Sequence, residues 1–182
     1  MVTIRPATPD DYPAIGELTT AAYVTAGHVA PDDEYAQILV DMAARQHELY
    51  VADVDGQVAG AVNIVTPGSE HSQVAYDNEG EFRMLAVAPQ YQGRGIGRAL
   101  VQFVLDQAQA QGLHQVAITT MTTMTSAQAM YEAMGFHRAP ERDWNLYTAG
   151  YTDDPEGHET FMVYIYPLNS TTSSKGDSWL TT

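Results

Sequence analysis

The chain alternates between two kinds of hydrophobic pattern, one typical of strands and one typical of helices. Alternating or short continuous apolar runs predict strands at 2–5, 49–52, 57–65, 81–87, 115–120 and 160–166. Apolar residues spaced by three and four predict helices at 12–23, 31–42, 96–111 and 126–134. Asp55-Gly56 is typical of a hairpin turn, and residues 67–78 are polar and predict a loop. Strands and helices in this order predict an α/β fold with a mixed sheet.

The stretch from Glu81 to Leu105 organises the rest of the chain. Its predicted strand ends at Ala88-Pro89, where proline removes a backbone donor and disfavours helix before it. The glycine-rich run 92–97 follows and leads into a predicted amphipathic helix, with Gly112 where that helix would end.

A glycine-rich turn between a strand and a helix is suited to binding phosphate. The first helical turn has unpaired N–H groups and a positive dipole, and glycine lets an anion approach the backbone. Arg94 and Arg98 add positive charge to this turn. The spacing excludes the dinucleotide pattern G-x-G-x-x-G, and the P-loop fails because no Gly-Lys-Ser/Thr follows. Gln92, Gly95 and Gly97 instead match the pattern Q/R-x-x-G-x-G/A.

Composition limits the class of protein. The chain has 182 residues, 45% hydrophobic and 17% charged, which predicts a globular domain at 1–167 followed by a polar tail at 168–182. There is no cysteine, so disulfides, a thiol nucleophile and cysteine metal sites are excluded. The sequence shows neither a signal peptide nor an apolar run long enough to cross a bilayer, and we expect no membrane partner and a cytoplasmic location.

The formal net charge of −15 argues against nucleic acid as a partner, because its phosphates require basic surfaces. Long-range attraction would favour a cationic acceptor, although general solubility explains such a charge equally well. The histidines form no ligand pattern, and we expect no metal.

Two blocks of sequence resemble the GNAT superfamily of acyl-CoA-dependent N-acyltransferases. The first consists of Leu85-Ala86-Val87-Ala88-Pro89, Tyr91 and Gln92-Gly93-Arg94-Gly95-Ile96-Gly97. The second consists of Ala127, Met130-Tyr131-Glu132 and Gly135-Phe136, which is similar to the family pattern A-x-x-L-Y-E…G-F. The resemblance covers about Val2 to Tyr166 and implies a mixed, mostly antiparallel, twisted central sheet flanked by helices. In this family the sheet splays open where acyl-CoA binds.

The resemblance also implies which residues hold the co-substrate acetyl-CoA. Backbone N–H groups of the glycine turn would bind its pyrophosphate, and the backbone of the central strand would pair with its pantetheine arm. The predicted cofactor-binding residues are Leu85, Ala86, Val87, Gln92, Gly93, Arg94, Gly95, Ile96, Gly97 and Arg98.

Three residues are predicted to take part in catalysis. Tyr131 falls at the family position near the cofactor sulfur and is the candidate general acid, since a phenol can protonate a leaving thiolate. By resemblance, the backbone N–H near Leu85 is the candidate oxyanion donor. Glu81 aligns with a position, four residues before Leu85, that some members of the family use as a base, and so it is the candidate base, with Glu79 and ordered water as alternatives. A tyrosine in a packing role and a solvated carboxylate are the competing interpretations.

The sequence determines the donor better than the acceptor. The resemblance implies transfer of acetyl to a primary amine by direct attack in a ternary complex; a non-catalytic acyl-CoA sensor and a longer-chain acyltransferase are the alternatives. Arg83 would pair with Glu81 or another carboxylate, or bind a substrate carboxylate. The acidic and aromatic stretch 140–158 would border the acceptor site, or form an ordinary loop. Met124 stands where the family often has Asn, and homodimers are common in the family.

Overall fold

The computed structural model describes residues 1–25, 27, 48–69 and 71–168. The predicted helix at 31–42 lies outside the described residues, as does the predicted tail beyond residue 168.

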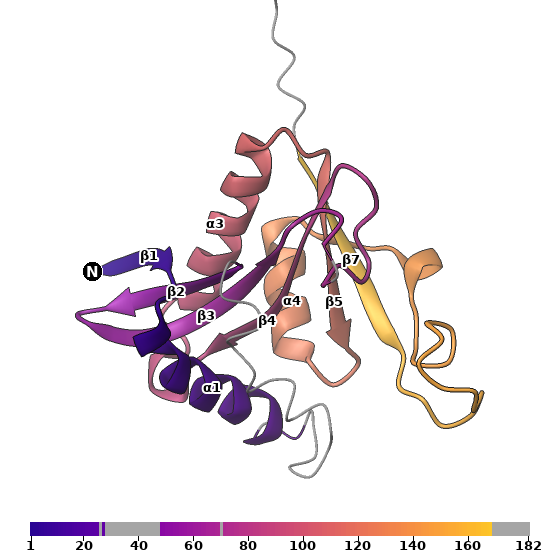
Figure 1. The fold of residues 1–182 in the computed structure, drawn as a ribbon, viewed down its shortest axis with the longest axis horizontal. Coiled ribbons are helices and arrows are strands. Elements are labelled where there is room, and N and C mark those ends of the chain that lie inside the picture. The colour runs from indigo at the N-terminus through magenta and orange to yellow at the C-terminus, as the bar shows by residue number, and fades with distance from the viewer. Residues whose placement is uncertain (26, 28–47, 70, 169–182) are drawn as a thin grey trace, which may run out of the picture.

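A seven-stranded sheet runs through the described part of the molecule (Figure 1). Its spatial order is β1-β2-β3-β4-β5-β7-β6, and every neighbouring pair is antiparallel except β4 and β5. This confirms the predicted mixed, mostly antiparallel sheet. The strands are β1 (Val2–Pro6), β2 (Leu49–Val54), β3 (Gln57–Val65), β4 (Glu79–Val87), β5 (Gln115–Met121), β6 (His137–Arg138) and β7 (Phe161–Pro167).

Strands β4 and β5 pair over only part of their length. The parallel pairing covers Glu79–Phe82 of β4 and stops where Phe82 lies opposite Ile118. Beyond that point β4 continues to Val87 along β3, while β5 continues to Met121 along β7. The sheet therefore opens between the C-terminal halves of β4 and β5.

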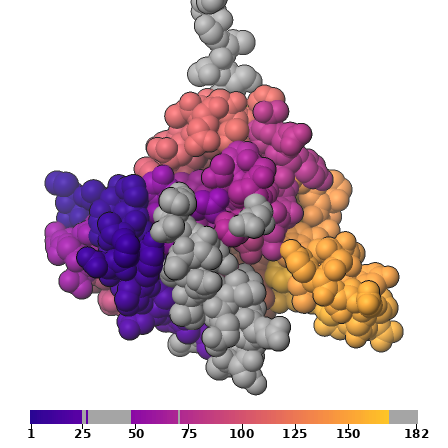
Figure 2. All heavy atoms as spheres, in the orientation of Figure 1, coloured from indigo at the N-terminus to yellow at the C-terminus, as the bar shows by residue number. Residues whose placement is uncertain are grey.

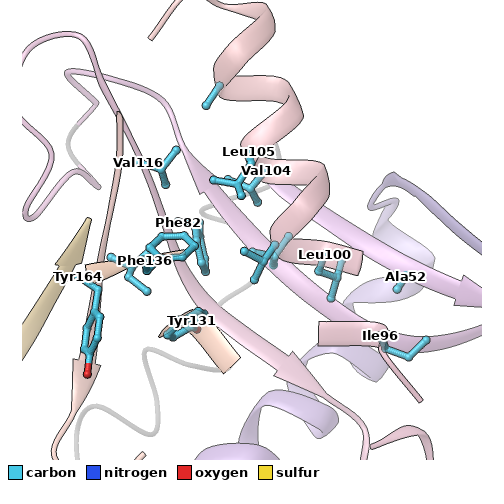
Figure 3. Packing of buried hydrophobic residues seen from close by; sticks show 14 of the residues in the cluster. Ala52, Phe82, Ile96, Leu100, Val104, Leu105, Val116, Tyr131, Phe136 and Tyr164 are labelled. Carbon is cyan, nitrogen blue, oxygen red and sulfur yellow. The ribbon is translucent and has the colours of Figure 1, made fainter. Parts of the chain in front are cut away.

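Helices α3 (Ile96–Ala110) and α4 (Thr125–Met134) cover one face of the sheet, which we call the α3 face. Apolar side chains of α3, including Leu100 and Val104, pack on Phe82 and Val116 of the central strands (Figure 3). The buried positions of α3 follow the predicted spacing of three and four, because that spacing places them on one side of the helix. Gly112 adopts φ +72° just after the helix, as expected of a helix-ending glycine.

The opposite face, which we call the α1 face, has two separate covers. Helix α1 (Tyr12–Thr20) packs Ile15 and Leu18 on Val51 and Ala61 of β2 and β3. The other half of this face is covered by residues 72–76 and 139–144, with Val74 packed on β5 and β7. In the space-filling view the indigo N-terminal elements and the orange residues 140–158 lie at opposite ends (Figure 2). Short single turns complete these connections: η1 (Pro9–Asp11), η2 (Ala21–Thr25), η4 (Pro89–Tyr91) and η5 (Pro140–Arg142).

A bulge in β4 lies beside the opening of the sheet. Met84 adopts φ +57°, a left-handed conformation that side chains other than glycine rarely take. The pairing with β3 shifts at this point, because Ala61 opposes Ala86 whereas Asn63 opposes Arg83. The extra residue in β4 therefore interrupts the regular alternation of the strand.

The bulge reverses which residues face α3. Phe82 lies in the core of the α3 face, and after the bulge Leu85 and Val87 contact that core instead of Ala86. Ala86 packs on the α1 face. Without the extra residue, Leu85 would lie on the same face as Arg83, because side chains alternate along a strand.

An ion pair attaches the 139–144 segment to β4. The Arg142 guanidinium contacts the Glu79 carboxylate at 2.8 Å, and both side chains are 8% exposed. Arg142 also donates to the Val74 carbonyl and lies 3.9 Å from the centre of the Tyr76 ring. Burial would raise the pKa of Glu79, but hydrogen bonds from Arg142, the Tyr76 N–H and the Gln115 amide outweigh it and lower the pKa. Glu79 is thus a structural anion on the α1 face.

Replacing this carboxylate should destabilise the fold in a pH-dependent way. We expect Glu79→Gln to lower the free energy of unfolding by about 3 kcal/mol at neutral pH, since it leaves Arg142 unpaired. The wild-type advantage is full above the ordinary carboxyl pKa of 4.5 and is lost as the pH falls through the lowered pKa. Urea unfolding of both proteins between pH 3 and pH 7, beside the exposed control Glu156→Gln, measures this. A constant difference across that range would contradict it.

Candidate active site

The opening between β4 and β5 forms a cavity of about 680 Å³. Four elements and a turn contribute its walls: the C-terminal halves of β4 and β5, the first turn of α3, the first two turns of α4, and the glycine turn before α3. Ala22 and Tyr23 of η2 border it from the α1 face. A volume of this size is in the range of cavities that bind cofactors and other small molecules.

The glycine turn brings unpaired backbone donors to one end of this cavity. Gly93 and Gly95 adopt φ +73° and +79°, conformations that glycine takes without steric cost. Gly95 caps α3 and no side chain occupies the cap position, so the N–H groups of the first helical turn lack intrahelical partners. Gly97 packs against Met130, and a Cβ there would lie 3.4 Å from the Met130 sulfur. The turn and α4 are therefore close neighbours.

Polar side chains of the turn add to these donors. The Arg94 guanidinium lies 5.4 Å from the centre of the Tyr91 ring, and Arg98 lines the cavity. Gln92 donates to the Val87 carbonyl at 3.4 Å and so joins the turn to the end of β4. Arg94, which was predicted to bind the cofactor, does not itself line the cavity but lies over Tyr91 of its wall. Arg98 and a helix N-terminus at one end of the cavity, with Arg94 close by, make a suitable site for a pyrophosphate.

The part of β4 beyond the bulge supplies the cavity with a strand edge. Leu85, Ala86 and Val87 all line the cavity, as does Ile96 at the start of α3. This stretch of β4 pairs with β3 on one side, and on the other side β5 has diverged. An extended amide-bearing ligand could therefore hydrogen-bond to this edge as an added strand would.

Tyr131 reaches the cavity from α4. It lines the cavity although its side chain is buried, and its ring lies 6.0 Å from the Phe82 ring and 5.5 Å from the Phe136 ring (Figure 3). Burial raises the pKa of the Tyr131 phenol above its ordinary value of 10.0. The hydroxyl therefore stays protonated at neutral pH and can donate a hydrogen bond. Met124 is the cap residue of α4, and no side-chain hydrogen bond caps this helix.

The structure does not bring the Glu81 carboxylate into the cavity. Glu81 is 2% exposed and accepts hydrogen bonds from the backbone N–H groups of Gln73, Val74 and Ala75 at about 3.0 Å each. The Ser72 hydroxyl also donates to it at 3.3 Å. Glu81 thus holds the 72–75 segment against the sheet.

Of the alternatives predicted for Arg83, a pair with Glu81 or with another carboxylate is wrong for the described residues, while binding of a substrate carboxylate stays a prediction. Arg83 lines the cavity and donates to the His71 carbonyl at 3.1 Å. Alternation along β4 places Arg83 on the α1 face with Glu81, but the donors of the 72–75 segment occupy that carboxylate instead.

Two features of the site escaped sequence analysis. The bulge at Met84 has no sequence signal, because methionine is an unusual residue for a positive φ. Thr119 and Thr120 line the cavity at the point where β5 leaves β4, and the Trp144 indole N–H donates to the Thr119 hydroxyl at 3.3 Å. Their place on a regular strand gave no reason to single them out.

Within the described ranges, no group of three His, Asp or Glu side chains is arranged to hold a metal ion. None of the helices in those ranges is both long enough and apolar enough to span a membrane.

The left-handed glycine at the cap of α3 offers a direct test of the phosphate cradle. Alanine at Gly95 costs about 1 kcal/mol because of φ +79°, and its Cβ would meet open space. We expect Gly95→Ala to raise the acetyl-CoA Kd roughly tenfold by shifting the turn. Gly112→Ala is the matched control, since φ is +72° and the space is also open, at the other end of α3. Equal Kd values for the two variants in calorimetric titration would contradict the prediction.

Comparison with known proteins gives the family. The model of the acetyltransferase (GNAT) family matches residues 12–136. The [ribosomal protein bS18]-alanine N-acetyltransferase of Salmonella typhimurium strain LT2 is 29% identical over 98 residues, which are 54% of this chain and 62% of the relative. The mycothiol acetyltransferase of Cellulomonas flavigena is 32% identical over 147 residues, which are 76% of this chain and 40% of the relative. The chain thus spans less than two thirds of either relative.

The fold agrees with the same family. A Salmonella typhimurium protein solved with its cofactor acetyl-CoA superposes with a TM-score of 0.64 at 21% identity, over 93% of this chain and 95% of that one. At this identity the likeness concerns the fold alone. The family model, however, matches well over half of the chain, including the glycine turn and Tyr131. This chain belongs to the GNAT acetyltransferase family.

Proposed function

We propose that the protein transfers the acetyl group of acetyl-CoA to a primary amine by direct attack in a ternary complex. One observation carries this proposal: the opening between β4 and β5 brings to one cavity the glycine turn, a buried phenol and the edge of β4 at 85–87, which pairs with β5 nowhere in the described residues. The chain has no cysteine that could form an acyl-enzyme thioester. The amine would therefore attack the thioester carbon directly.

The co-substrate would lie along the opening in an extended form. Its pyrophosphate would bind the first turn of α3 with Arg94 and Arg98, and its pantetheine amides would follow the edge from Leu85 to Val87. These assignments place the thioester near the point where β4 and β5 separate. Backbone N–H groups at that point are suited to stabilise a developing oxyanion, and Leu85 is the candidate donor.

The reaction forms a C–N bond and breaks the C–S bond, so the amine must lose a proton and the thiolate must gain one. Tyr131 is proposed as the donor toward the sulfur, because it is the buried hydroxyl that α4 brings to the cavity. Its raised pKa makes it a weaker acid than an ordinary phenol. We therefore infer that it stabilises the departing thiolate by a hydrogen bond, with any net proton transfer completed by solvent.

The proton of the amine is proposed to leave through water on the α1 face. Glu81 lies on that face, but backbone donors of the 72–75 segment already surround its carboxylate. Glu79 is engaged with Arg142 and does not line the cavity. A direct role for either carboxylate would require these hydrogen bonds to break first. Glu81 as direct base stays a prediction that the variant below tests.

An assay with a panel of acceptor amines tests the proposed function itself. Thiol release from acetyl-CoA should occur with at least one class among polyamines, α-amino acids, aminoglycosides and short peptides. One of the two relatives described above is named for the alanine of a ribosomal protein and the other for mycothiol. Both protein and small-molecule amines therefore belong in the panel. Tight acetyl-CoA binding without turnover would favour the sensing module instead. Faster turnover with a longer acyl-CoA would favour the longer-chain alternative.

Removing the Tyr131 hydroxyl should slow turnover more than it weakens binding. We expect Tyr131→Phe to lower kcat by about 100-fold, as for loss of a hydrogen-bond donor to charge that develops in the transition state, with little change in the KM for acetyl-CoA. The control is Tyr164→Phe, another buried tyrosine, whose hydroxyl donates to Glu132 at 3.1 Å and does not line the cavity. A similar kcat for both variants would refute the role of Tyr131.

The raised pKa of the Tyr131 phenol also predicts how kcat depends on pH. Because burial raises its pKa above 10.0, Tyr131 should remain protonated up to that pH. Wild-type kcat should therefore show no decline from phenol ionisation below about pH 10. Ultraviolet difference titration of wild type and Tyr131→Phe identifies this ionisation directly. A tyrosine that titrates below pH 10 in wild type and is missing from the variant would contradict the assignment.

The Glu81→Gln variant distinguishes a structural role of the Glu81 carboxylate from a role as the catalytic base. The variant presents an amide N–H₂ group to backbone donors, so we expect a loss of about 1–3 kcal/mol in the free energy of unfolding. If water accepts the amine proton, kcat at saturating acceptor should fall less than tenfold and the shape of its pH profile should stay unchanged. A stable variant that loses activity by 1000-fold or more, together with the acid limb of the profile, would identify Glu81 as the base.

A further inference from the structure

The arginines of the described residues fall into two groups. One group forms ion pairs with carboxylates: Arg5 with Asp11 and Asp53, Arg138 with Asp143, and Arg142 with Glu79. The other group forms no ion pair among the described residues: Arg83 and Arg98 line the cavity, and Arg94 lies over the ring of Tyr91, a residue of the cavity wall. Arg94 and Arg98 belong to the glycine turn and are accounted for by the phosphates of the co-substrate. Arg83 is a cation at the cavity that the co-substrate does not explain.

Arg83 lies where the acceptor would have to approach. It follows Phe82, the last residue of β4 that pairs with β5, and so it stands at the point where the two strands separate. Phe82 belongs to the core of the α3 face, so alternation places Arg83 on the α1 face. The glycine turn and Tyr131 approach from the α3 face. An acceptor entering opposite them would meet Arg83.

Within the described part of the chain, the guanidinium of Arg83 has unused hydrogen-bonding capacity. Its bond to the His71 carbonyl is a single contact for a group with five N–H donors. None of the ion pairs among the described residues includes Arg83. A half-buried guanidinium at a cavity is suited to bind a carboxylate through two parallel hydrogen bonds.

The neighbouring strand adds a second unsatisfied polar group. Asn63 is the residue of β3 directly opposite Arg83, and it is 0% exposed. Neither the oxygen nor the nitrogen of its side-chain amide has a hydrogen-bond partner among the described residues. Buried polar groups are normally hydrogen-bonded, so this amide is a second polar group with unused hydrogen-bonding capacity at the β3 position opposite Arg83.

We propose that the acceptor carries a carboxylate beside its amine and that Arg83 binds this carboxylate on the α1 face of the sheet. The inference rests on the proposed acetyl transfer and narrows its acceptor to the class of amino acids and related amino-carboxylates. Such molecules carry both charges near neutral pH, so the net charge of −15 does not repel them as it would a simple anion. Arg83 positions the amine and takes no part in proton transfer.

Matched acceptors test this proposal. Each α-amino acid that is acetylated is compared with its own carboxamide, which keeps the amine and side chain and removes the negative charge; spermidine serves as an acceptor without a carboxylate. We expect kcat/KM in wild type to favour the acid over the amide by about 10-fold or more, as for a charge-assisted hydrogen bond. In Arg83→Gln that ratio should fall toward one, and the change should lie mainly in the acceptor KM.

Two further variants make the result specific. Arg83→Lys keeps the charge but loses the two-pronged geometry, so its acid-to-amide ratio should lie between wild type and Arg83→Gln. Arg98→Gln is the matched control at the glycine turn. It should raise the KM for acetyl-CoA and leave the acid-to-amide ratio of wild type in place. Thermal unfolding of each variant identifies any that fail to fold.

The possible outcomes distinguish failure of the Arg83 proposal from failure of the proposed acetyl transfer. Turnover of amides or spermidine as efficient as turnover of acids, or a ratio that Arg83→Gln does not change, overturns the role of Arg83 while acetyl transfer stands. Acetyl-CoA binding without turnover of any amine overturns both. A high ratio that is lost in Arg83→Gln and kept in Arg98→Gln supports the proposal.

Discussion

The parting of β4 from β5 is the constraint on which the rest of the site depends. Parallel pairing ends at Phe82, and beyond it, among the described strands, β4 pairs with β3 and β5 pairs with β7. An unpaired strand edge inside a sheet would ordinarily be costly, because backbone donors and acceptors lose their partners. Here the strand edge lines a cavity, and a ligand with amides in an extended chain could hydrogen-bond to it as a neighbouring strand would. The glycine turn, Tyr131 and Arg83 are all placed relative to this gap.

The bulge at Met84 determines how the two faces divide the chemistry. Because it adds one residue to β4, Arg83 faces the α1 side whereas Leu85 and Val87 face α3. Under the proposed function, this division gives the co-substrate the α3 side of the gap and the acceptor the α1 side. A positive φ at a residue other than glycine is strained, and such strain is commonly retained at functional sites. The bulge thus places Arg83 and Leu85 on opposite faces of the sheet, as the proposed transfer of acetyl from a donor on one face to an acceptor on the other requires.

Much of the fold could be predicted from sequence because its signals are local. Apolar spacing in α3, the glycines of the turn and the alternation of β7 each reflect the geometry of one element. The glycine turn could be recognised for the same reason, since unpaired N–H groups and positive φ belong to a few consecutive residues. The Glu81 environment could not be predicted, because its donors come from residues 72–75, and a polar loop gives no signal of where its N–H groups will point. The Arg142–Glu79 ion pair could not be predicted either, because it joins residues that are far apart in the chain.

The central claim is that acetyl-CoA fills the gap between the strands as an added strand with its phosphates on the glycine turn. Amide hydrogen exchange with and without acetyl-CoA tests it most directly, since it reports each backbone N–H separately. The account predicts added protection at residues 85–87 of β4 and at residues 93–98, and little change at the β1–β2 edge of the sheet. Protection confined to other parts of the chain, or none at saturating acetyl-CoA, would contradict it.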